Sequence, residues 1–383
     1  GCVGAGGARA RVGRKLSDTI DRLEQRIYAA AGQQFNINSP KQLGKVLFED
    51  LGLPHGKKTK TGWSTNADVL EKLKDHPLVA DVLTYRQYAK LKSTYADGLL
   101  KVIDPDGRIR TSFQMTVTAT GRLSSTEPNL QNIPTRTELG SKMREMFVAA
   151  PGHVLVDADY SQIELRLLAH ISGDTAMQQA FLSGADFHTV TAARVFHVPQ
   201  DQVTHQMRSR AKAVNFGIVY GISAFSLSQD IGVTVQEAKE YMDRYFATYT
   251  GVKQYMTDVV DKAREQGYVE TLWHRRRALP ELKSSNFNMR SFGERVALNM
   301  PIQGTAADII KLAMVRVHSR LAQEGLAARL IMQVHDELIV ECPEEEVPRV
   351  EALLQQEMQG VAELSVPLLA EAHTGRNWLA AKG

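Results

Sequence analysis

Aspartates interrupt two otherwise apolar stretches of the chain. The stretch LVDADYSQIELRLLAH (155–170) carries Asp157 and Asp159, and LIMQVHDELIVEC (330–342) carries Asp336 where two strand-like runs meet. Each position has an ordinary explanation, because a strand-end Asp can cap the following helix and Asp is favoured in tight turns. Considered together, the two stretches predict adjacent strands that place Asp159 and Asp336 side by side.

Such a pair of carboxylates predicts a divalent-metal site. Adjacent carboxylates repel each other unless a cation lies between them, and ligand sets made only of oxygen favour Mg²⁺ over zinc or copper. Two Mg²⁺ ions suit phosphoryl transfer, in which one lowers the pKa of an attacking hydroxyl and the other holds the leaving phosphate. Asp157 lies on the same strand face as Asp159 by alternation, so it could join the metal ligands, although a supporting or surface position is favoured.

A third stretch, QMRSRAKAVNFGIVYG (206–221), combines cations and aromatic rings at helical spacing. One helix face carries an apolar stripe, formed by Ala211, Val214, Ile218 and Ile222. A different face carries residues spaced by four, namely Arg208, Lys212, Phe216 and Tyr220. An exposed basic flank with two half-buried rings is the structural alternative, but cations followed by rings suit the phosphates, sugar and base of a nucleoside triphosphate. The sequence has no Walker pattern of a Gly-rich loop followed by Gly-Lys-Ser/Thr, which argues against a P-loop.

Composition bounds the class of protein. With 383 residues, of which 43% are hydrophobic and 23% charged, the chain can bury a large core and divide into two or three lobes. Apolar runs stay below the ~18 residues of a membrane span, and the two cysteines suit a reducing, intracellular compartment. The net charge of +3 is too mild to identify a polyanionic partner, but separate basic clusters at 56–62, 90–92, 208–212 and 274–277 indicate an extended anionic ligand.

The elements expected around these residues alternate between helices and strands. Helical periodicity covers 15–31, a helix capped at Ser64 or Thr65 follows, and 77–100 are expected to continue as a long helix. Strand patterns occur at 107–125, 268–272 and 330–342, and helical patterns over most of 174–265. This order favours a mixed sheet with helices packed on it and a lobe inserted between the two sequence halves of the sheet.

Three of these stretches carry a family resemblance. DYSQIELR (159–166), RSRAKAVNFGIVYG (208–221) and QVHDELIVE (333–341) resemble motifs A, B and C of the family A DNA polymerases, the bacterial DNA polymerase I type. TATGRLSSTEPNLQNIP (118–134) and ERVALNMPIQGTAADIIK (294–311) are similar to further segments of that family. The resemblance covers nearly everything after the first dozen residues.

The resemblance implies an α+β fold of the right-hand polymerase type. Residues 1–100 would form a helical thumb, truncated at its N-terminus, and 101–172 with 284–383 would form a palm with an antiparallel sheet. Residues 173–283 would form helical fingers. On the same grounds we expect a polymerase domain fragment that is cytoplasmic, monomeric and not attached to a membrane.

The matching positions imply roles at the site. Asp159 and Asp336 would bind two Mg²⁺ ions, for which Mn²⁺ could substitute, while Glu337 would support them and His335 the primer end. Contacts to the incoming nucleotide are implied for Arg208, Lys212, His188, Phe216, Tyr220 and Glu164. Among these, Lys212 would protonate the departing pyrophosphate and Glu164 would exclude a ribose 2′-hydroxyl.

Four more residues would follow the nascent base pair from the minor groove. They are Arg122, Arg295, Asn299 and Gln303. Both kinds of pair present acceptors in that groove, purine N3 and pyrimidine O2, so side-chain donors can test the shape of a pair without reading its sequence.

These roles predict a DNA-templated DNA polymerase of replication and repair, whose partners are primer-template DNA and dNTPs. It would join the primer 3′-hydroxyl to the dNTP α-phosphate and release pyrophosphate, and we expect no 3′→5′ proofreading domain in this chain. A single-subunit RNA polymerase is the nearest alternative, and Glu164 argues against it. A silent DNA-binding subunit has no use for clustered carboxylates, and a metal-dependent nuclease has no use for a triphosphate-binding helix.

Overall fold

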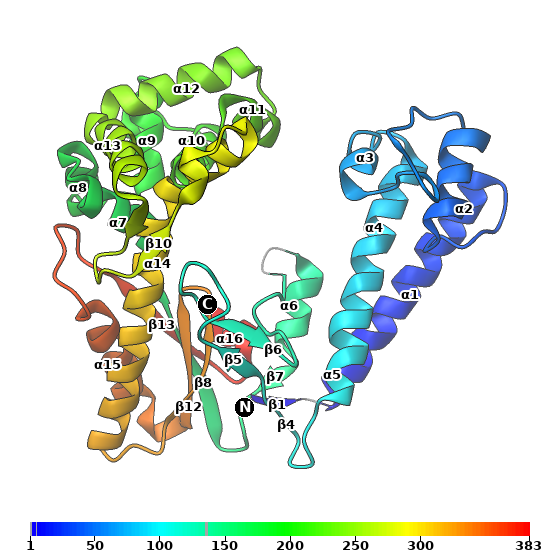
Figure 1. The fold of residues 1–383 in the computed structure, drawn as a ribbon. Helices are drawn as coiled ribbons and strands as arrows, with labels where there is room; N and C mark the ends of the chain where they lie inside the picture. Colours follow the sequence, from blue (N-terminus) through cyan, green and yellow to red (C-terminus); the bar gives the residue numbers. More distant parts are fainter. Residues whose placement is uncertain (1, 5, 135–136) are drawn as a thin grey trace. The chain divides into compact units, whose positions relative to one another are not determined.

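The computed structural model describes residues 2–4, 6–134 and 137–383. The chain divides into two compact units (Figure 1). The first unit comprises Gly1–Ser112, Glu127–Ala150 and Asn377–Ala380. The second comprises Phe113–Thr126, Pro151–Arg376 and Ala381–Gly383.

The first unit is mainly helical, and its two long helices pack along each other (Figure 1). Its helices are α1 (Gly6–Ala31), α2 (Pro40–Gly44), α3 (Ala67–Glu71), α4 (Pro77–Leu91), α5 (Gly98–Lys101) and α6 (Glu138–Arg144). Its core includes Leu23, Ile27, Leu43, Leu47, Leu78 and Val82. Its strands are β1 (Cys2–Gly4), β4 (Arg108–Ile109) and β7 (Phe147–Val148), in the order β4-β1-β7, and the hairpin β2 (Lys58–Thr59) with β3 (Gly62–Trp63).

One expectation for this unit needs correction, and another is confirmed with a change of helix type inside it. The cap of α3 is Asn66, whose side chain accepts a hydrogen bond from Val69 N, and not Ser64 or Thr65. The long helix expected at 77–100 is confirmed, although a π-helical segment, Lys92–Asp97, stands between α4 and α5. Propensity patterns do not distinguish a π-helical turn from an α-helix, since the side-chain spacing differs little over one turn.

The second unit is built on a four-stranded sheet in the order β11-β12-β8-β13. The strands are β8 (His153–Tyr160), β11 (Arg329–Val334), β12 (Glu337–Pro343) and β13 (Ala370–Gly375). All three pairings are antiparallel, so the mixed sheet favoured by element order is wrong and the antiparallel sheet implied by the family resemblance is confirmed. Element order alone cannot fix the direction of every strand. A hairpin such as β11 and β12 is antiparallel, but β8 comes from a distant part of the chain and pairs with β12 only in the tertiary fold.

Helices accompany this sheet and form a separate cluster above it in Figure 1. The long α14 (Phe287–Gln323) and α15 (Val347–Gln359) lie beside the strands, and α7 (Ile163–Ser172) follows β8 directly. The helical cluster consists of α8 (Thr175–Leu182), α9 (Phe187–Val195), α10 (His205–Val219), α11 (Ala224–Ile231), α12 (Val235–Thr248) and α13 (Thr250–Gln266). Two short hairpins, β5 (Ser112–Gln114) with β6 (Ser124–Thr126) and β9 (Tyr268–Glu270) with β10 (Arg276–Ala278), and the short helix α16 (Trp378–Lys382) complete the chain.

The helical cluster starts where the sequence offers capping side chains. Asp174, Asp186, Thr204 and Ser223 each accept a backbone N–H at the first turn of the helix that follows. The apolar faces of these helices join those of α7, α14 and the sheet in one core, which includes Val156, Leu167, Val214, Ile218, Ile309 and Leu338. In the part of the chain that the structure describes, none of the helices combines the length and the apolar character that crossing a membrane requires.

Candidate active site

Strand pairing brings the two predicted carboxylates together. Asp159 on β8 is the register partner of Glu337 on β12, and Tyr160 N donates a hydrogen bond of 3.0 Å to the backbone oxygen of Asp336. His335 and Asp336 form the two-residue turn between β11 and β12, with His335 at a φ of 51°. The expected adjacency of the two strands is therefore observed.

Negative charge is concentrated at this end of the sheet. Burial, followed by repulsion from Glu337 and Asp336, raises the pKa of Asp159 to about 7. Burial also raises the pKa of Asp336. Lys382, near the end of the chain, lies 3.5 Å from Glu337 and offsets part of this charge. A divalent cation would relieve the remaining repulsion, which is the physical reason to look for one here.

The ligand chemistry fits a hard cation that is completed by substrate. Asp159 and Asp336 supply carboxylate oxygens, and Mg²⁺ commonly binds one or two carboxylates together with substrate phosphates rather than an all-protein cage. Among the residues that the structure describes, no set of three or more His, Cys, Asp or Glu side chains is arranged to hold a metal ion. The residues thus fit a metal that is shared with a phosphate ligand.

Asp157 lies deeper in the same strand than the sequence pattern suggested. Its side chain is 2% exposed, and its register partners are Ile339 on β12 and His373 on β13. A surface position is therefore wrong for Asp157. Alternation placed it correctly on the face of Asp159, but the position of β8 between two strands, which buries that part of the face, could not be read from β8 alone.

Glu164, on the first turn of α7, links two predicted site residues. One carboxylate oxygen accepts a hydrogen bond of 3.0 Å from Arg122, and the other accepts one of 3.0 Å from the Tyr220 hydroxyl. Burial raises the pKa of Glu164, while Arg122 and the Tyr220 hydrogen bond oppose the rise. Burial and the proximity of Glu164 raise the pKa of Tyr220 to about 12, so its hydroxyl stays protonated and donates.

The basic face of α10 is arranged as its spacing predicted. Arg208 is half-exposed, Lys212 is exposed, and Phe216 and Tyr220 follow on successive turns. Asp186, the cap of α9, holds Arg208 through contacts of 2.6 and 3.2 Å. This ion pair lowers the pKa of Asp186 to about 2, so Asp186 is a carboxylate at neutral pH.

His188 is held in a defined orientation behind this face. Thr191 donates to Oδ1 of Asn215, which leaves the Asn215 amide nitrogen to donate to Nδ1 of His188 at 2.9 Å. Burial, with added repulsion from Arg208 and Lys212, lowers the pKa of His188 to about 4. His188 is therefore neutral at pH 7, and its Nε2 lies 3.4 Å from the amide nitrogen of Gln162. Its ring lies 5.6 Å from that of Phe216.

Three predicted residues form a row on α14 beside the end of α10. Arg295 is exposed, whereas Asn299 and Gln303 are partly buried. Asn299 donates to the backbone oxygen of Val219 at 3.4 Å, and the Arg295 side chain packs at Gly221. The structure thus brings α14, α10 and Glu164 into one region of the second unit.

The family model for DNA polymerase family A matches residues 8–380. The chain belongs to DNA polymerase family A. It is 55% identical over 375 residues to DNA polymerase I of Geobacillus stearothermophilus and of Bacillus subtilis, and these matches cover 97% of this chain and 43% of each relative. The chain therefore spans less than half the length of these relatives.

A solved structure shows that the family fold extends over the whole chain. The polymerase domain of Pol1 from M. smegmatis, in complex with a DNA primer-template and dNTP, superposes with a TM-score of 0.94 at 46% identity. The match covers 100% of this chain and 68% of that one. The α+β fold expected from the family A resemblance is confirmed.

Sequence reasoning missed several residues of this family A site. Asp186 holds Arg208, Asn215 orients His188, and Lys382 approaches Glu337. Asp186 had a detectable signal, since it precedes a helical pattern and caps it. The Asn215 and Lys382 contacts join residues far apart in the chain, and nothing in their local sequence marks them.

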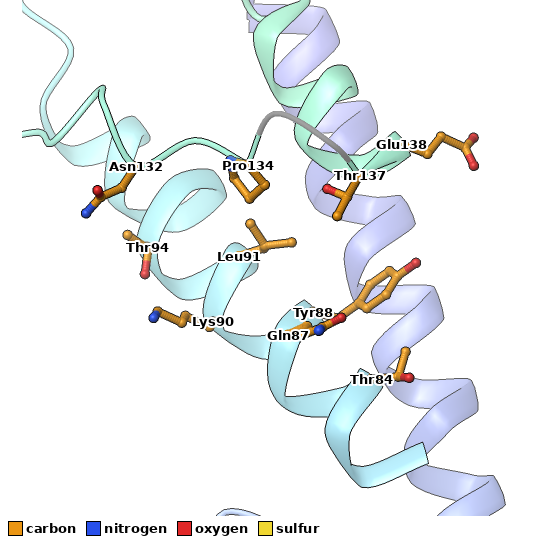
Figure 2. A pocket seen from close by; sticks show the side chains of 10 residues that line it. All are labelled: Thr84, Gln87, Tyr88, Lys90, Leu91, Thr94, Asn132, Pro134, Thr137 and Glu138. Atoms are coloured by element: carbon orange, nitrogen blue, oxygen red, sulfur yellow. The ribbon is translucent and has the colours of Figure 1, made fainter. Parts of the chain in front are cut away.

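The first unit has a candidate binding pocket of its own, with a volume of about 800 Å³ (Figure 2). Leu91 on α4 points toward Pro134, while Lys90, Thr94 and Asn132 lie together at one end. The remaining lining residues are Thr84, Gln87, Tyr88, Thr137 and Glu138. The pocket therefore combines one cation and one carboxylate, Lys90 and Glu138, with amide and hydroxyl groups.

Proposed function

We propose that this chain is a DNA-templated DNA polymerase that adds dNTPs to a primer 3′-hydroxyl and releases pyrophosphate. The observation that supports this most directly is the pairing of β8 with β12, which gathers Asp159, Asp336 and Glu337 in the unit that also carries the basic face of α10. Family membership and the primer-template and dNTP in the M. smegmatis structure support the same activity.

Asp159 and Asp336 are the proposed ligands of two divalent ions, Mg²⁺ or, in its place, Mn²⁺. When bound, these ions lower the pKa of the primer hydroxyl and neutralise charge on the phosphates. Glu337 supports the two aspartates from the neighbouring register position, and His335 in the turn contacts the primer end.

The triphosphate is assigned to α10 and α9. Arg208 and Lys212 bind phosphate oxygens, and the neutral His188 adds a ring N–H donor. Lys212 lies one turn beyond Arg208 and donates a proton to the departing pyrophosphate. Asp186 uses the Nε side of Arg208, which leaves the other guanidinium nitrogen, Nη1, for phosphate.

The sugar and base are assigned to the residues next to these. Phe216 packs on the incoming nucleoside, and Tyr220 lies where the template base enters. Glu164 occupies the space that a ribose 2′-hydroxyl would need, and its hydrogen bonds to Arg122 and Tyr220 hold it there. This steric role favours a DNA polymerase over an RNA polymerase.

Donors for the minor groove are assigned to four residues around Glu164 and α14. Arg122 is linked to Glu164, and the other three are Arg295, Asn299 and Gln303 on successive turns of α14. Purine N3 and pyrimidine O2 are the acceptors that such donors meet in either kind of pair.

We assign the lobes as the family implies, with a thumb at 1–100, palm segments at 101–172 and 284–383, and fingers at 173–283. The helical character of α1 and α4 is consistent with a thumb, the four-stranded sheet with a palm and the helical cluster with fingers. The pocket lined by Lys90, Thr94 and Asn132 offers groups suited to a DNA phosphate backbone. We further propose a monomer that works in the cytoplasm in replication and repair.

Alanine substitution of the carboxylates tests this function. Asp159→Ala or Asp336→Ala should reduce primer extension with Mg²⁺ and dNTPs by at least ~1,000-fold, because each removes a metal ligand. Duplex binding should change little, since Lys and Arg contacts to phosphates dominate that affinity. The measurement is single-turnover extension alongside binding of the same labelled primer-template. Substantial extension by either variant would contradict the assignment.

A further inference from the structure

The basic run HRRR (274–277) has no role in the function proposed above, yet its two central arginines differ in environment. Arg275 donates from Nε to Oδ1 of Asp308 at 2.8 Å. Arg276 lies over the ring of Tyr268 at 4.3 Å, and its Nε is 3.4 Å from Glu270. Their side chains are 41% and 63% exposed, respectively. The neighbours therefore form a natural pair of test and control.

Arg275 is anchored to α14 through a nearly buried carboxylate. Asp308 is 6% exposed, and its second oxygen accepts a hydrogen bond of 2.6 Å from Thr271. The Thr271 hydroxyl in turn accepts from Arg275 N, and Thr305 on α14 accepts from Leu272 N. The turn between β9 and β10 is thus tied to α14 through Arg275 itself and through Thr271 and Leu272, which precede it.

The guanidinium of Arg275 packs against the backbone of Gly121. A Cβ added to Gly121 would come within 2.8 Å of Nε and 3.0 Å of Cζ of Arg275. A φ of 83° also disfavours any side chain at Gly121. From the other direction, a Cβ on Gly304 of α14 would approach the Thr120 oxygen to 3.3 Å. The loop 118–122 is therefore seated closely on both Arg275 and α14.

This loop sets the starting point of the Arg122 side chain. Gly121 precedes Arg122 directly, and the Thr118 hydroxyl donates to the Arg122 backbone oxygen at 2.6 Å. The Arg122 guanidinium then reaches Glu164 at 3.0 Å. A shift of Gly121 would displace the Arg122 backbone and, with it, the donor that faces the minor groove.

We infer that Arg275 is a positioning residue for Arg122, holding the loop 118–122 where Arg122 can donate to the minor-groove acceptor of the primer-terminal pair. The inference rests on the proposed function of Arg122. The competing explanation is purely structural, in which the Arg275 and Asp308 ion pair only ties the β9–β10 turn to α14. The positioning role requires the planar guanidinium that packs on Gly121, whereas the structural role requires only a positive charge near Asp308.

Arg275→Lys separates these explanations, because lysine keeps a positive charge for Asp308 but has no planar group to pack on Gly121. Arg276→Lys is the matched control. Each protein extends two primers that differ in one atom: the terminal purine carries N3, or carries C–H in its place. In the wild-type protein, loss of a charge-assisted hydrogen bond should lower kcat/KM by about 10- to 100-fold.

We call the fold loss of kcat/KM on replacing N3 by C–H the N3 penalty. We expect Arg276→Lys to keep this penalty and Arg275→Lys to reduce it to less than ~3-fold, chiefly because Arg275→Lys extends the normal primer more slowly. The Tm of both variants should change little. If Arg275→Lys folds poorly, Asp308→Asn provides a second test. It weakens the same anchor while keeping an oxygen for one bond, so its loss of kcat/KM on the primer without N3 should lie between those of the wild-type protein and Arg275→Lys. Arg122→Ala combined with Arg275→Lys should be no slower than Arg122→Ala alone, because residues that act through one another are not additive.

A full N3 penalty in Arg275→Lys, or an additive loss in the double variant, would overturn the inference and leave the proposed function intact. A wild-type protein that extends both primers equally would instead overturn the minor-groove role of Arg122, and the positioning role with it. A protein that extends neither primer would contradict the polymerase assignment itself.

Discussion

At the scale of single residues, the protein tolerates a charge arrangement that does not favour its own stability. Asp159 sits beside Glu337 and Asp336, and burial together with their negative charge raises its pKa to about 7. Each ionised member of the cluster raises the free energy of the folded state while no cation is bound. Such perturbed carboxylates are typical of functional sites, where the arrangement serves a ligand.

The raised pKa makes stability depend on pH in a defined direction. The folded state binds the Asp159 proton more tightly than the unfolded state, so the stabilisation is complete below about pH 4 and is lost as the pH rises through about 7. In chelator at pH 8, Asp159→Asn should therefore unfold at a higher temperature than the wild-type protein, and near pH 4 the two should converge. Although surrounding protein atoms raise its pKa, the Asp159 side chain also reaches solvent, and screening by that solvent limits the gain to ~1 kcal/mol.

Thermal unfolding across that pH range measures the effect. Asp243→Asn, which changes an exposed carboxylate on α12, is the control and should show no such pH-dependent gain. If the unfolding temperatures of Asp159→Asn and the wild-type protein differ by the same amount at pH 4 and pH 8, the cluster does not raise the Asp159 pKa.

Glu164 should control the choice of sugar. Glu164→Ala opens space in a buried position, so we expect ribonucleotide use to rise by at least ~10-fold relative to dNTP use. The variant also frees Arg122 and Tyr220 from their shared partner, which should lower dNTP use moderately. The ratio of kcat/KM for an rNTP and its dNTP is the measurement, and an unchanged ratio would remove Glu164 from the steric role.

At the scale of elements, the helices of the cluster that includes α10 begin at caps of unequal burial. Asp174 is 3% exposed and accepts from Met177 N at 2.8 Å and from Val252 N at 3.0 Å, so it joins the starts of α8 and α13. Thr204 caps α10 through a single exposed bond of 3.2 Å to Met207 N. Both side chains accept a backbone N–H at a helix start, but Asp174 is buried and Thr204 is exposed.

Asp174→Ala should therefore lower the free energy of unfolding by about 2–3 kcal/mol, because it leaves two buried N–H groups without their acceptor. Thr204→Ala should cost only about 1 kcal/mol, the usual value for an exposed cap. Denaturant unfolding of both variants checks the order, and equal losses would contradict the importance given to burial.

At the scale of the whole molecule, each compact unit has a core of its own, and the acidic site lies in the second unit. The acidic residues on α1 have the features of an exposed helix surface: Asp18 and Asp21 are exposed, and the neighbouring Arg26 pairs with Asp81 of α4 at 3.0 Å. We see in them an exposed helix face rather than a second catalytic cluster.

We therefore predict that this chain does not trim primers. A labelled primer with a mismatched 3′ end, incubated with Mg²⁺ and without dNTPs, should keep its full length, because excision needs a carboxylate cluster other than Asp159 and Asp336. The same preparation should extend a matched primer once dNTPs are added. Shortening from the 3′ end that persists in Asp336→Ala would reveal a second active site.

Sequence by itself determined the features that depend on local chemistry and periodicity. The spacing of Arg208, Lys212, Phe216 and Tyr220 predicted a shared helix face, because a helical repeat brings every fourth residue to nearly the same side. The apolar runs around Asp159 and Asp336 predicted strands, and the conjunction of motifs placed the chain in its family. Each of these inferences uses residues that are close together in the chain.

Tertiary structure alone decided what joins distant segments. The antiparallel direction of the sheet, the burial of Asp157, the hold of Asp186 on Arg208 and the seat of Gly121 on Arg275 all arise where separate elements meet. Local sequence carries little trace of such contacts, because a side chain that packs or pairs across the fold obeys the shape and charge of its partner rather than the spacing of its neighbours.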